Sequence, residues 1–365
     1  MTRRGGKADD TMAPGRPRRN GQKTGQRSTG TQAPIGYTWA DYVEALVAEH
    51  GTLAAVAWKL VERGLAEDTT SVERALRRLR GRGQRDGGLI GQRLLRVFGV
   101  PATVEAQARW MGTYHSPFGD LPVQLCVDQL RLWDRPPLSE SRARVWILLG
   151  LAGVALRRRA FDDARTLLEG ASALVDSPAA RLEHHLATSY LLTRLDANVE
   201  RAEAAARPHL ERARGILDTA RAELDPADAA CFQARLADHE AFDANRRGDS
   251  ARALALYRAL PAEDVHPFAS YRRDAGLAFG LHRQGARDEA LGMARRACDH
   301  AGDGGYVRLR VMGLLMVARI QGAPDHASTL ARAAAIAKRL EDPELLVRVE
   351  RARGRAHVPP LPGVT

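Results

Sequence analysis

The sequence has little of what marks a secreted, metal-bound or membrane-spanning protein. Its 365 residues include three cysteines, Cys126, Cys231 and Cys298, too few and too far apart for a disulfide framework or a zinc site. The longest apolar run, residues 145–156, is well short of the roughly 20 residues that cross a bilayer. The N-terminus lacks the apolar core of a secretory signal. We therefore expect a soluble, cytoplasmic protein.

Motifs of common enzymes are missing as well. The sequence has no phosphate-binding P-loop, no His-Glu-x-x-His pair and no Gly-x-Ser-x-Gly elbow. His184 and His185 are adjacent, so on a helix they point about 100° apart and make a poor metal pair. His115 precedes a Ser-Pro-Phe-Gly-Asp run typical of a turn, and the Asp-His-Glu run at residues 238–240 lies in a predicted helix where exposed charges are expected. We expect no enzymatic activity, no metal and no cofactor.

Basic residues are almost all arginine, and their distribution is uneven. Only four of the 55 are lysine, a bias typical of a GC-rich coding sequence, so an arginine cluster alone is a weak functional signal. Residues 1–35 hold eight basic and two acidic residues, a net +6 out of the total of +11. This segment has almost no large apolar residue, and we expect a flexible basic tail. Such a tail either adds salt-sensitive affinity for nucleic acid or is a solubilising extension.

Apolar residues at helical spacing predict a small helical module over residues 37–100. The expected helices cover residues 39–50, 53–63, 70–80 and 89–98. Thr52 is placed to cap the second of them, and Asp68, Thr69 or Thr70 to cap the third.

Opposite charges are separated within this module. Residues 36–73 hold two basic and seven acidic residues, whereas residues 74–96 hold eight arginines and one aspartate. Three short helices with a strongly basic third one, capped by Thr or Ser, resemble a helix-turn-helix DNA-binding domain. The resemblance implies that residues 70–80 enter the major groove and that the Gly- and Arg-rich residues 81–88 form a wing or backbone-contacting loop. The predicted DNA-binding residues are Thr70, Ser71, Arg74, Arg77, Arg78, Arg80, Arg82 and Arg85. The other interpretation is a helical cap whose arginines form a solvated face.

Self-comparison predicts a repeat domain over residues 139–353, after a boundary at Pro136 and Pro137. Three sets of residues each recur at an interval of 37: Gly248, Gly285 and Gly322; Ala253, Ala290 and Ala327; Leu260, Ala297 and Ala334. Each unit is predicted as a helix, a Gly turn and a second helix, with Ser139 or Ser141 capping the first helix. Two earlier units are looser, and the 51 residues between their last alanine, Ala202, and Ala253 predict either a longer helix pair or an insertion in the second unit.

The first unit carries Trp146-x-x-Leu149-Gly150, followed by a turn and by alternating small and large residues. Helix pairs of this kind resemble tetratricopeptide (TPR) repeats, although the period here is longer. The resemblance implies an all-α, right-handed superhelix of helical hairpins, whose first helices line a concave groove that binds peptides or proteins. Residues 354–365 are expected to form a flexible C-terminal tail.

Aligning the units on the turn glycine places similar side chains in columns along this groove. Cationic and amide donors beside aromatic rings favour an acidic or carboxylate-ended peptide. The other interpretation is that the aromatic residues pack and the arginines reflect composition. The predicted groove residues are Arg235, Phe242, Asn245, Arg246, Arg272, Phe279, His282, Arg283 and Arg319.

Residues 101–138 connect the module to the repeats. All five tryptophans precede residue 147, so this connector, with an amphipathic helix predicted at residues 121–133, is expected to pack on its neighbours rather than act as a hinge. The favoured function is a DNA-binding transcriptional regulator whose TPR-like repeats bind a protein or peptide partner. The alternative is a TPR-like scaffold or adaptor without DNA binding, in which the N-terminal helices cap the solenoid.

Overall fold

The computed structural model describes residues 36–262, 265–322, 325–340 and 342–356, and within them the chain is all-α, as predicted. These residues form seventeen α-helices and three short 3₁₀ helices, with no β-strand. The predicted basic tail, residues 1–35, lies outside the described residues, as does most of the predicted C-terminal tail. Residues 354–356, expected to belong to that tail, instead complete the last helix.

The N-terminal module is built from four helices around its own core. They are α1 (Trp39–His50), α2 (Leu53–Glu62), α3 (Thr69–Arg80) and α4 (Gly88–Phe98). Their buried apolar side chains form a cluster separate from the cores of the later helices. Thr52 caps α2 by accepting a hydrogen bond from the Ala55 amide, as predicted. Of the three caps predicted for α3, Asp68 is the one that forms, because its carboxylate accepts hydrogen bonds from the amides of Thr70 and Ser71.

The Gly-rich residues 81–88 form a packed turn against the core of this module. Trp39 is completely buried and donates its indole N–H to the carbonyl of Arg85 at 2.9 Å. A Cβ on Gly87 would overlap the same indole ring, so only glycine fits beside it. The Trp39 amide also donates to the carbonyl of Gly83 at 2.9 Å. The segment is therefore anchored to α1, while its Arg82 and Arg85 side chains are exposed.

The connector packs against the helices that follow it, as predicted. It contains α5 (Ala102–Gly112), η1 (Pro117–Asp120), α6 (Val123–Trp133) and η2 (Leu138–Glu140). Its buried residues share one core with those of the next helices. A Cβ on Gly150 would lie 2.7 Å from the Met111 carbonyl, so α5 approaches the next helix closely. The tryptophans contribute unevenly to this packing, since Trp146 is buried and Trp110 is 40% exposed.

Polar and aromatic contacts join the N-terminal module to the connector. The side chain of Gln84 donates to the Leu132 carbonyl at 3.2 Å, and the Gly87 amide donates to Glu140 Oε1 at 3.2 Å. The rings of Tyr37 and Trp133 stack with centroids 6.4 Å apart. The module is thus fixed to the connector by a few contacts and not by a shared core.

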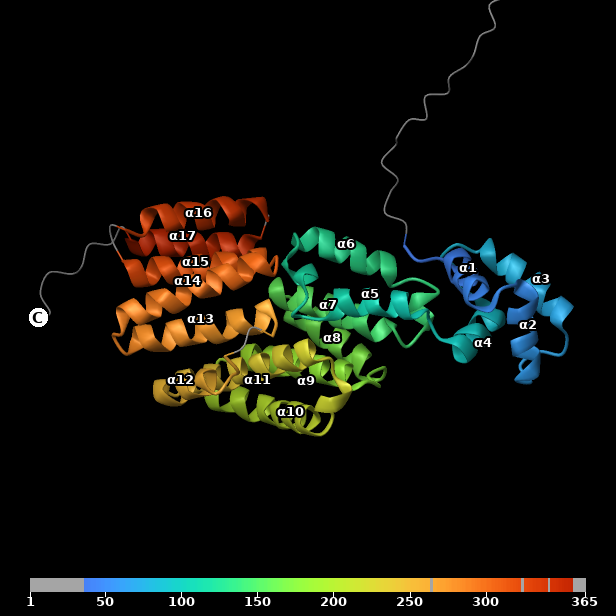
Figure 1. Ribbon diagram of the computed structural model, residues 1–365, viewed down its shortest axis with the longest axis horizontal. Coiled ribbons are helices and arrows are strands. Elements are labelled where there is room, and N and C mark those ends of the chain that lie inside the picture. Colours follow the sequence, from blue (N-terminus) through green and yellow to red (C-terminus); the bar gives the residue numbers. More distant parts are fainter. Residues whose placement is uncertain (1–35, 263–264, 323–324, 341, 357–365) are drawn as a thin grey trace, which may run out of the picture. The chain divides into compact units, whose positions relative to one another are not determined.

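The remaining helices pack in consecutive antiparallel pairs, which is consistent with a helical repeat array (Figure 1). The pairs are α7 (Arg144–Arg157) with α8 (Phe161–Ser172), α9 (Pro178–Leu195) with α10 (Val199–Thr219), α11 (Pro226–Arg246) with α12 (Ser250–Arg258), α13 (Pro267–Arg283) with α14 (Arg287–Asp303), and α15 (Val307–Gln321) with α16 (Ala327–Arg339). A short η3 (Arg221–Glu223) follows α10, and α17 (Pro343–Ala356) follows the last pair. The first helices also contact one another in chain order, from α7 to α15 and α17.

The turn glycines have the conformation that their spacing predicts, but the last unit shifts its register. Gly248, Gly285 and Gly322 have φ values of +85°, +84° and +67°, which favour glycine. Ala253 and Ala290 are buried between helices, whereas Ala327, their predicted equivalent, is exposed. The reason is that α16 begins five residues after its glycine, while α12 and α14 begin two residues after theirs.

The length of the second helix pair and the cap of the first repeat helix were also predicted from the sequence. The second pair is longer, as expected, since α9 and α10 have 18 and 21 residues. The predicted cap of the first repeat helix is wrong, because α7 begins at Arg144 without a side-chain cap. Ser139 lies in η2, and the Ser141 hydroxyl donates to the Leu138 carbonyl instead.

Candidate functional sites: a filled groove, an open cleft and a basic helix face

A short segment between α5 and α6, residues 113–121, contacts the first helix of all five pairs. We call it the inner segment. Its polar contacts reach Arg157 of α7, Glu183 of α9, Asp228 of α11, Arg272 of α13 and Arg308 of α15. The chain itself therefore occupies part of the surface that the first helices present.

Tyr114 is held in this segment by a buried ion pair and a second arginine. Its amide donates to Glu183 Oε2 at 3.3 Å, and its phenol oxygen accepts from Arg272 Nη2 at 3.0 Å. Glu183 also binds both guanidinium nitrogens of Arg235, at 2.5 and 2.8 Å, with both side chains almost fully buried. The Arg235 guanidinium lies 4.7 Å from the Tyr114 ring centroid. These contacts bury Arg235 beneath the inner segment.

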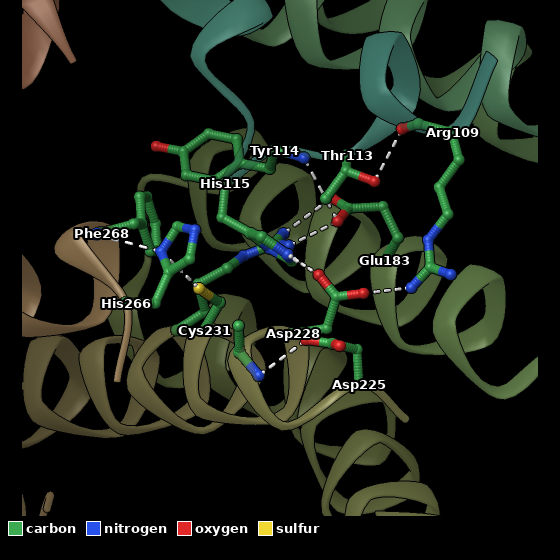
Figure 2. Close-up of polar contacts among 12 residues, drawn as sticks. Arg109, Thr113, Tyr114, His115, Glu183, Asp225, Asp228, Cys231, His266 and Phe268 are labelled. Atoms are coloured by element: carbon green, nitrogen blue, oxygen red, sulfur yellow. Dashed lines mark hydrogen bonds and ion pairs between the residues drawn. The ribbon is translucent and has the colours of Figure 1, made fainter. Parts of the chain in front are cut away.

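His115 points into a polar cluster between α5 and α11 (Figure 2). Its Nε2 lies 2.9 Å from one oxygen of Asp228, and the other oxygen of Asp228 pairs with Arg109. Burial lowers the pKa of His115, although the bond to Asp228 opposes this. Burial alone would raise the pKa of Asp228, but the bond from His115 and the charge of Arg109 hold it below its usual value. His115 is thus neutral at pH 7 and donates Nε2–H to an ionised carboxylate.

A cysteine and a second histidine lie beside this cluster without forming a reactive pair. Cys231 Sγ is 3.2 Å from His266 Nδ1, which also accepts the Phe268 amide as the cap of α13 (Figure 2). Burial raises the pKa of Cys231 to about 12, so the thiol stays protonated at neutral pH. A fully buried thiol has no access to a substrate, and the arrangement therefore serves packing rather than nucleophilic chemistry.

The other end of the inner segment caps α15. Asp120 accepts hydrogen bonds from the amides of Arg308 and Leu309, at 2.7 and 3.3 Å, in the first turn of that helix. The Tyr306 hydroxyl donates to the His115 carbonyl at 2.7 Å. Arg157 donates to the carbonyls of Gly119 and Leu121, at 2.6 and 2.9 Å. The Pro-Phe-Gly-Asp turn predicted from the sequence is present, and it binds the repeats at both ends.

Two of the predicted groove residues are therefore not available to a partner. Arg235 is buried against Glu183, and Arg272 binds Asp238 at 2.8 Å as well as the Tyr114 hydroxyl. The expectation of exposed charges at residues 238–240 is also wrong, because Asp238 is half-buried and accepts from Arg272 and from the Tyr257 hydroxyl at 2.6 Å. Arg235, Asp238 and Arg272 therefore bind other side chains of the protein, although their spacing along the helices predicted that they would be exposed.

Most of the other predicted groove residues lie together in a strip across the C-terminal turns of the first helices. Guanidinium groups lie over aromatic rings along it: Arg194 over Tyr190 and Phe242, Arg246 over Phe242, and Arg283 and Arg319 over Phe279, with centroid distances of 3.6 to 6.0 Å. Asn245 accepts from Arg283 Nη1 at 3.2 Å. His282, half-buried in the last turn of α13, completes the predicted set. These contacts bring several of the predicted groove residues near one another.

The strip borders an open cleft of about 1250 Å³ between α7, α9, α15 and α17. Tyr190 and Arg194 belong to both the strip and the cleft, and so does Arg319. Seven arginines line the cleft: Arg157, Arg158, Arg159, Arg194, Arg319, Arg348 and Arg351. The one described carboxylate in its lining is Asp342, which Arg157 binds at 2.9 Å. The cleft is therefore strongly cationic.

Sequence reasoning did not identify the arginines at the end of α7 as site residues. Residues 157–159 are three consecutive arginines that end the longest apolar run of the chain, and this run of charge was the available signal. Asp342 gave no signal, because its pairing with Arg157 joins residues 185 apart. Only the folded arrangement places them in one cleft.

The predicted DNA-binding residues lie on α3 and in the turn after it. Thr70, Arg74, Arg77 and Arg78 are exposed. They share one face of the helix, a sector of about 100° around its axis. Arg77 pairs with Glu73 at 2.7 Å, and Arg80 pairs with Glu44 at 2.5 Å. Arg82 donates to the Asp86 carbonyl. The remaining members, Ser71 and Arg85, are exposed as well.

The described part of the chain offers neither a metal centre nor a membrane span. Among its residues, no group of three or more His, Cys, Asp or Glu side chains is arranged to hold a metal ion. None of its helices is long and apolar enough to cross a membrane.

Comparison with known proteins does not assign the chain to a family. No protein-family model matches the sequence, and no curated protein matches it. The class that the structure defines is an all-helical protein whose described helices pack in consecutive antiparallel pairs.

Proposed function

We propose that this chain is a DNA-binding transcriptional regulator whose TPR-like repeat domain receives a protein or peptide partner. The observation that carries the proposal is the exposed basic face of α3, presented by a small module that has its own core. No described carboxylate pairs with Arg74 or Arg78, so both guanidinium groups are available to phosphates.

The partner-binding half of the proposal draws support from the open cleft and the strip beside it. Both lie on the first helices, which in TPR-like arrays form the ligand surface. Their arginines and aromatic rings are side-chain types that are enriched where proteins bind one another.

The DNA-binding half is tested by a gel-shift titration of the full chain on a mixed-sequence duplex of about 30 base pairs. We expect binding that weakens steeply with salt, because arginine–phosphate contacts release counterions. Replacing Arg74, Arg77 and Arg78 with Ala should lower the magnitude of the log–log salt slope by about 3, since each arginine that binds a phosphate contributes about 1 to that slope.

The matched control replaces three arginines of the repeat domain, Arg165, Arg295 and Arg332, which are exposed and lie outside the cleft. This variant has the same net charge as the α3 variant and should keep the wild-type salt slope. Equal reductions of the slope in both variants would mean that total charge, and not the α3 face, binds DNA.

The alternative is a scaffold or adaptor without DNA binding. The pairing of Arg77 with Glu73 and of Arg80 with Glu44 favours it, because arginines already paired on the surface contribute less to a phosphate site. A full chain that leaves duplex DNA unshifted at micromolar concentration and low salt would support this alternative.

A further inference from the structure

We propose that the open cleft binds a segment of a partner protein that carries acidic side chains next to apolar ones. This inference rests on the proposed partner-binding function and gives its chemistry. The surface differs from the groove predicted from the repeat columns, because part of that groove is filled by the inner segment.

The charge of the cleft selects an anionic partner. Seven arginines line it, and Asp342 is the one carboxylate among the described residues of its wall. Arg158, Arg159 and Arg319 are exposed and pair with no described carboxylate. An arginine fork binds a carboxylate through two parallel hydrogen bonds, which makes Asp and Glu side chains well-matched ligands.

The floor of the cleft is apolar, so a matching partner needs apolar side chains as well as acidic ones. Met312, Leu315 and Met316 of α15 are half-buried in its lining, and Val347 of α17 is 48% exposed there. Methionine adapts its shape to different partners, as in other surfaces that bind amphipathic segments. A nucleic acid would meet the arginines with its phosphates but would leave this floor without a matching surface, so a protein segment is favoured.

The size of the cleft fits a peptide better than a small molecule. Its volume of about 1250 Å³ exceeds the roughly 300–1000 Å³ of pockets that enclose drug-sized ligands. The molecule also contains a segment of its own bound to the same helices, since Arg157 at the edge of the cleft holds the carbonyls of Gly119 and Leu121. The first helices thus already bind one peptide backbone, and the cleft offers space for a second.

The test is a selection from a random library of twelve-residue peptides against the immobilised full chain. We expect enrichment of Asp and Glu together with Leu, Ile, Phe or Met. The affinity of a selected peptide is then measured by fluorescence anisotropy for the wild type and for the double variant Arg158→Glu/Arg319→Glu, where we expect a loss of at least tenfold.

The control is the double variant Arg295→Glu/Arg332→Glu, which makes the same change of charge at exposed positions outside the cleft and should bind within twofold of the wild type. Thermal unfolding of both variants verifies that they are folded. Selection of basic or uncharged peptides whose binding is lost in the cleft variant would overturn the acidic class and leave the partner-binding function standing. No enrichment, or binding unchanged in the cleft variant, would overturn the cleft as a partner site and with it the repeat-domain half of the proposed function.

Discussion

The two halves of the first helices carry similar side chains and use them differently. In the N-terminal halves of α9, α11 and α13, Glu183 binds Arg235 and Arg272 binds Asp238. Glu183 and Arg272 also bind Tyr114 of the inner segment. In the C-terminal turns, arginines such as Arg194 and Arg319 lie over aromatic rings at the edge of an open cleft. An arginine in a repeat column is thus held in place where a buried or half-buried carboxylate meets it, and it lies over an aromatic ring where none does.

A local cause adds to the recurrence of arginine at the ends of these helices. Arg194, Arg246, Arg283 and Arg319 all lie in or next to the last turn of a first helix, where a positive charge interacts favourably with the helix dipole. This stabilisation is worth at most about 1 kcal/mol at an exposed site. It explains why each helix keeps such a residue, and the parallel packing of the first helices then gathers the charges on one surface.

The largest effect that separates the two halves is expected from Arg235→Ala. Removing this arginine leaves Glu183 buried without its partner, which should lower the free energy of unfolding by about 3–5 kcal/mol. The matched change in the open half, Arg319→Ala, should alter stability by no more than about 0.5 kcal/mol. Urea denaturation followed by circular dichroism measures both.

Equal stabilities of these two variants would break the comparison, because the buried pair would then contribute no more than an exposed arginine. The double variant Arg235→Met/Glu183→Leu separates the cost of an unpaired buried charge from the contribution of the pair itself. This variant replaces both charges by apolar groups and should recover much of the stability that Arg235→Ala loses.

An intermediate effect is expected where the inner segment caps α15. Asp120→Ala removes the acceptor of the Arg308 and Leu309 amides and should lower the free energy of unfolding by about 1–2 kcal/mol. Asp120→Asn should lose much less, since asparagine caps helices as well as aspartate does. Hydrogen exchange should be faster in residues 113–121 and in the first turn of α15 for the alanine variant. Faster exchange confined to other helices would contradict the assigned contact.

The smallest effect concerns pH and the neutral histidine of the filled half. Burial lowers the pKa of His115, so the unfolded chain binds a proton at its ordinary pKa of about 6.5 while the folded chain does not. The contribution of His115 to the free energy of unfolding is therefore fully present above that pH and is lost as the pH falls. The loss is up to about 0.7 kcal/mol between pH 7 and pH 6 for each such histidine. His115→Gln should make this fall smaller. Urea midpoints at the two pH values check this, and identical falls in the wild type and the variant would refute the assignment.

The helices and their turns could be predicted because their determinants are local. Gly248, Gly285 and Gly322 mark turns at which the backbone needs a positive φ, and this need leaves a regular trace in the sequence. The cap at Thr52 is equally local, since its acceptor and donor are three residues apart. The shift of α16 was missed because the spacing of Ala327 is preserved while the helix start is not.

The inner segment and the cleft could not be predicted, because their contacts join distant parts of the chain. Tyr306 binds His115 across 191 residues, and Arg157 binds Asp342 across 185. Neither pair leaves a periodic signal. Arg235 and Arg272 were predicted as groove residues, but the sequence does not show that residues 113–121 return to cover them.

The most direct test of the comparison is the reactivity of individual arginines in the native protein. Brief treatment with an arginine-specific dicarbonyl reagent, followed by mass spectrometry, reports which guanidinium groups are accessible. We predict that Arg158, Arg159 and Arg319 react readily, that Arg235 does not react until the protein unfolds, and that a selected acidic peptide protects Arg158 and Arg319. Labelling of Arg235 as fast as that of Arg319 would contradict a filled groove beside an open cleft.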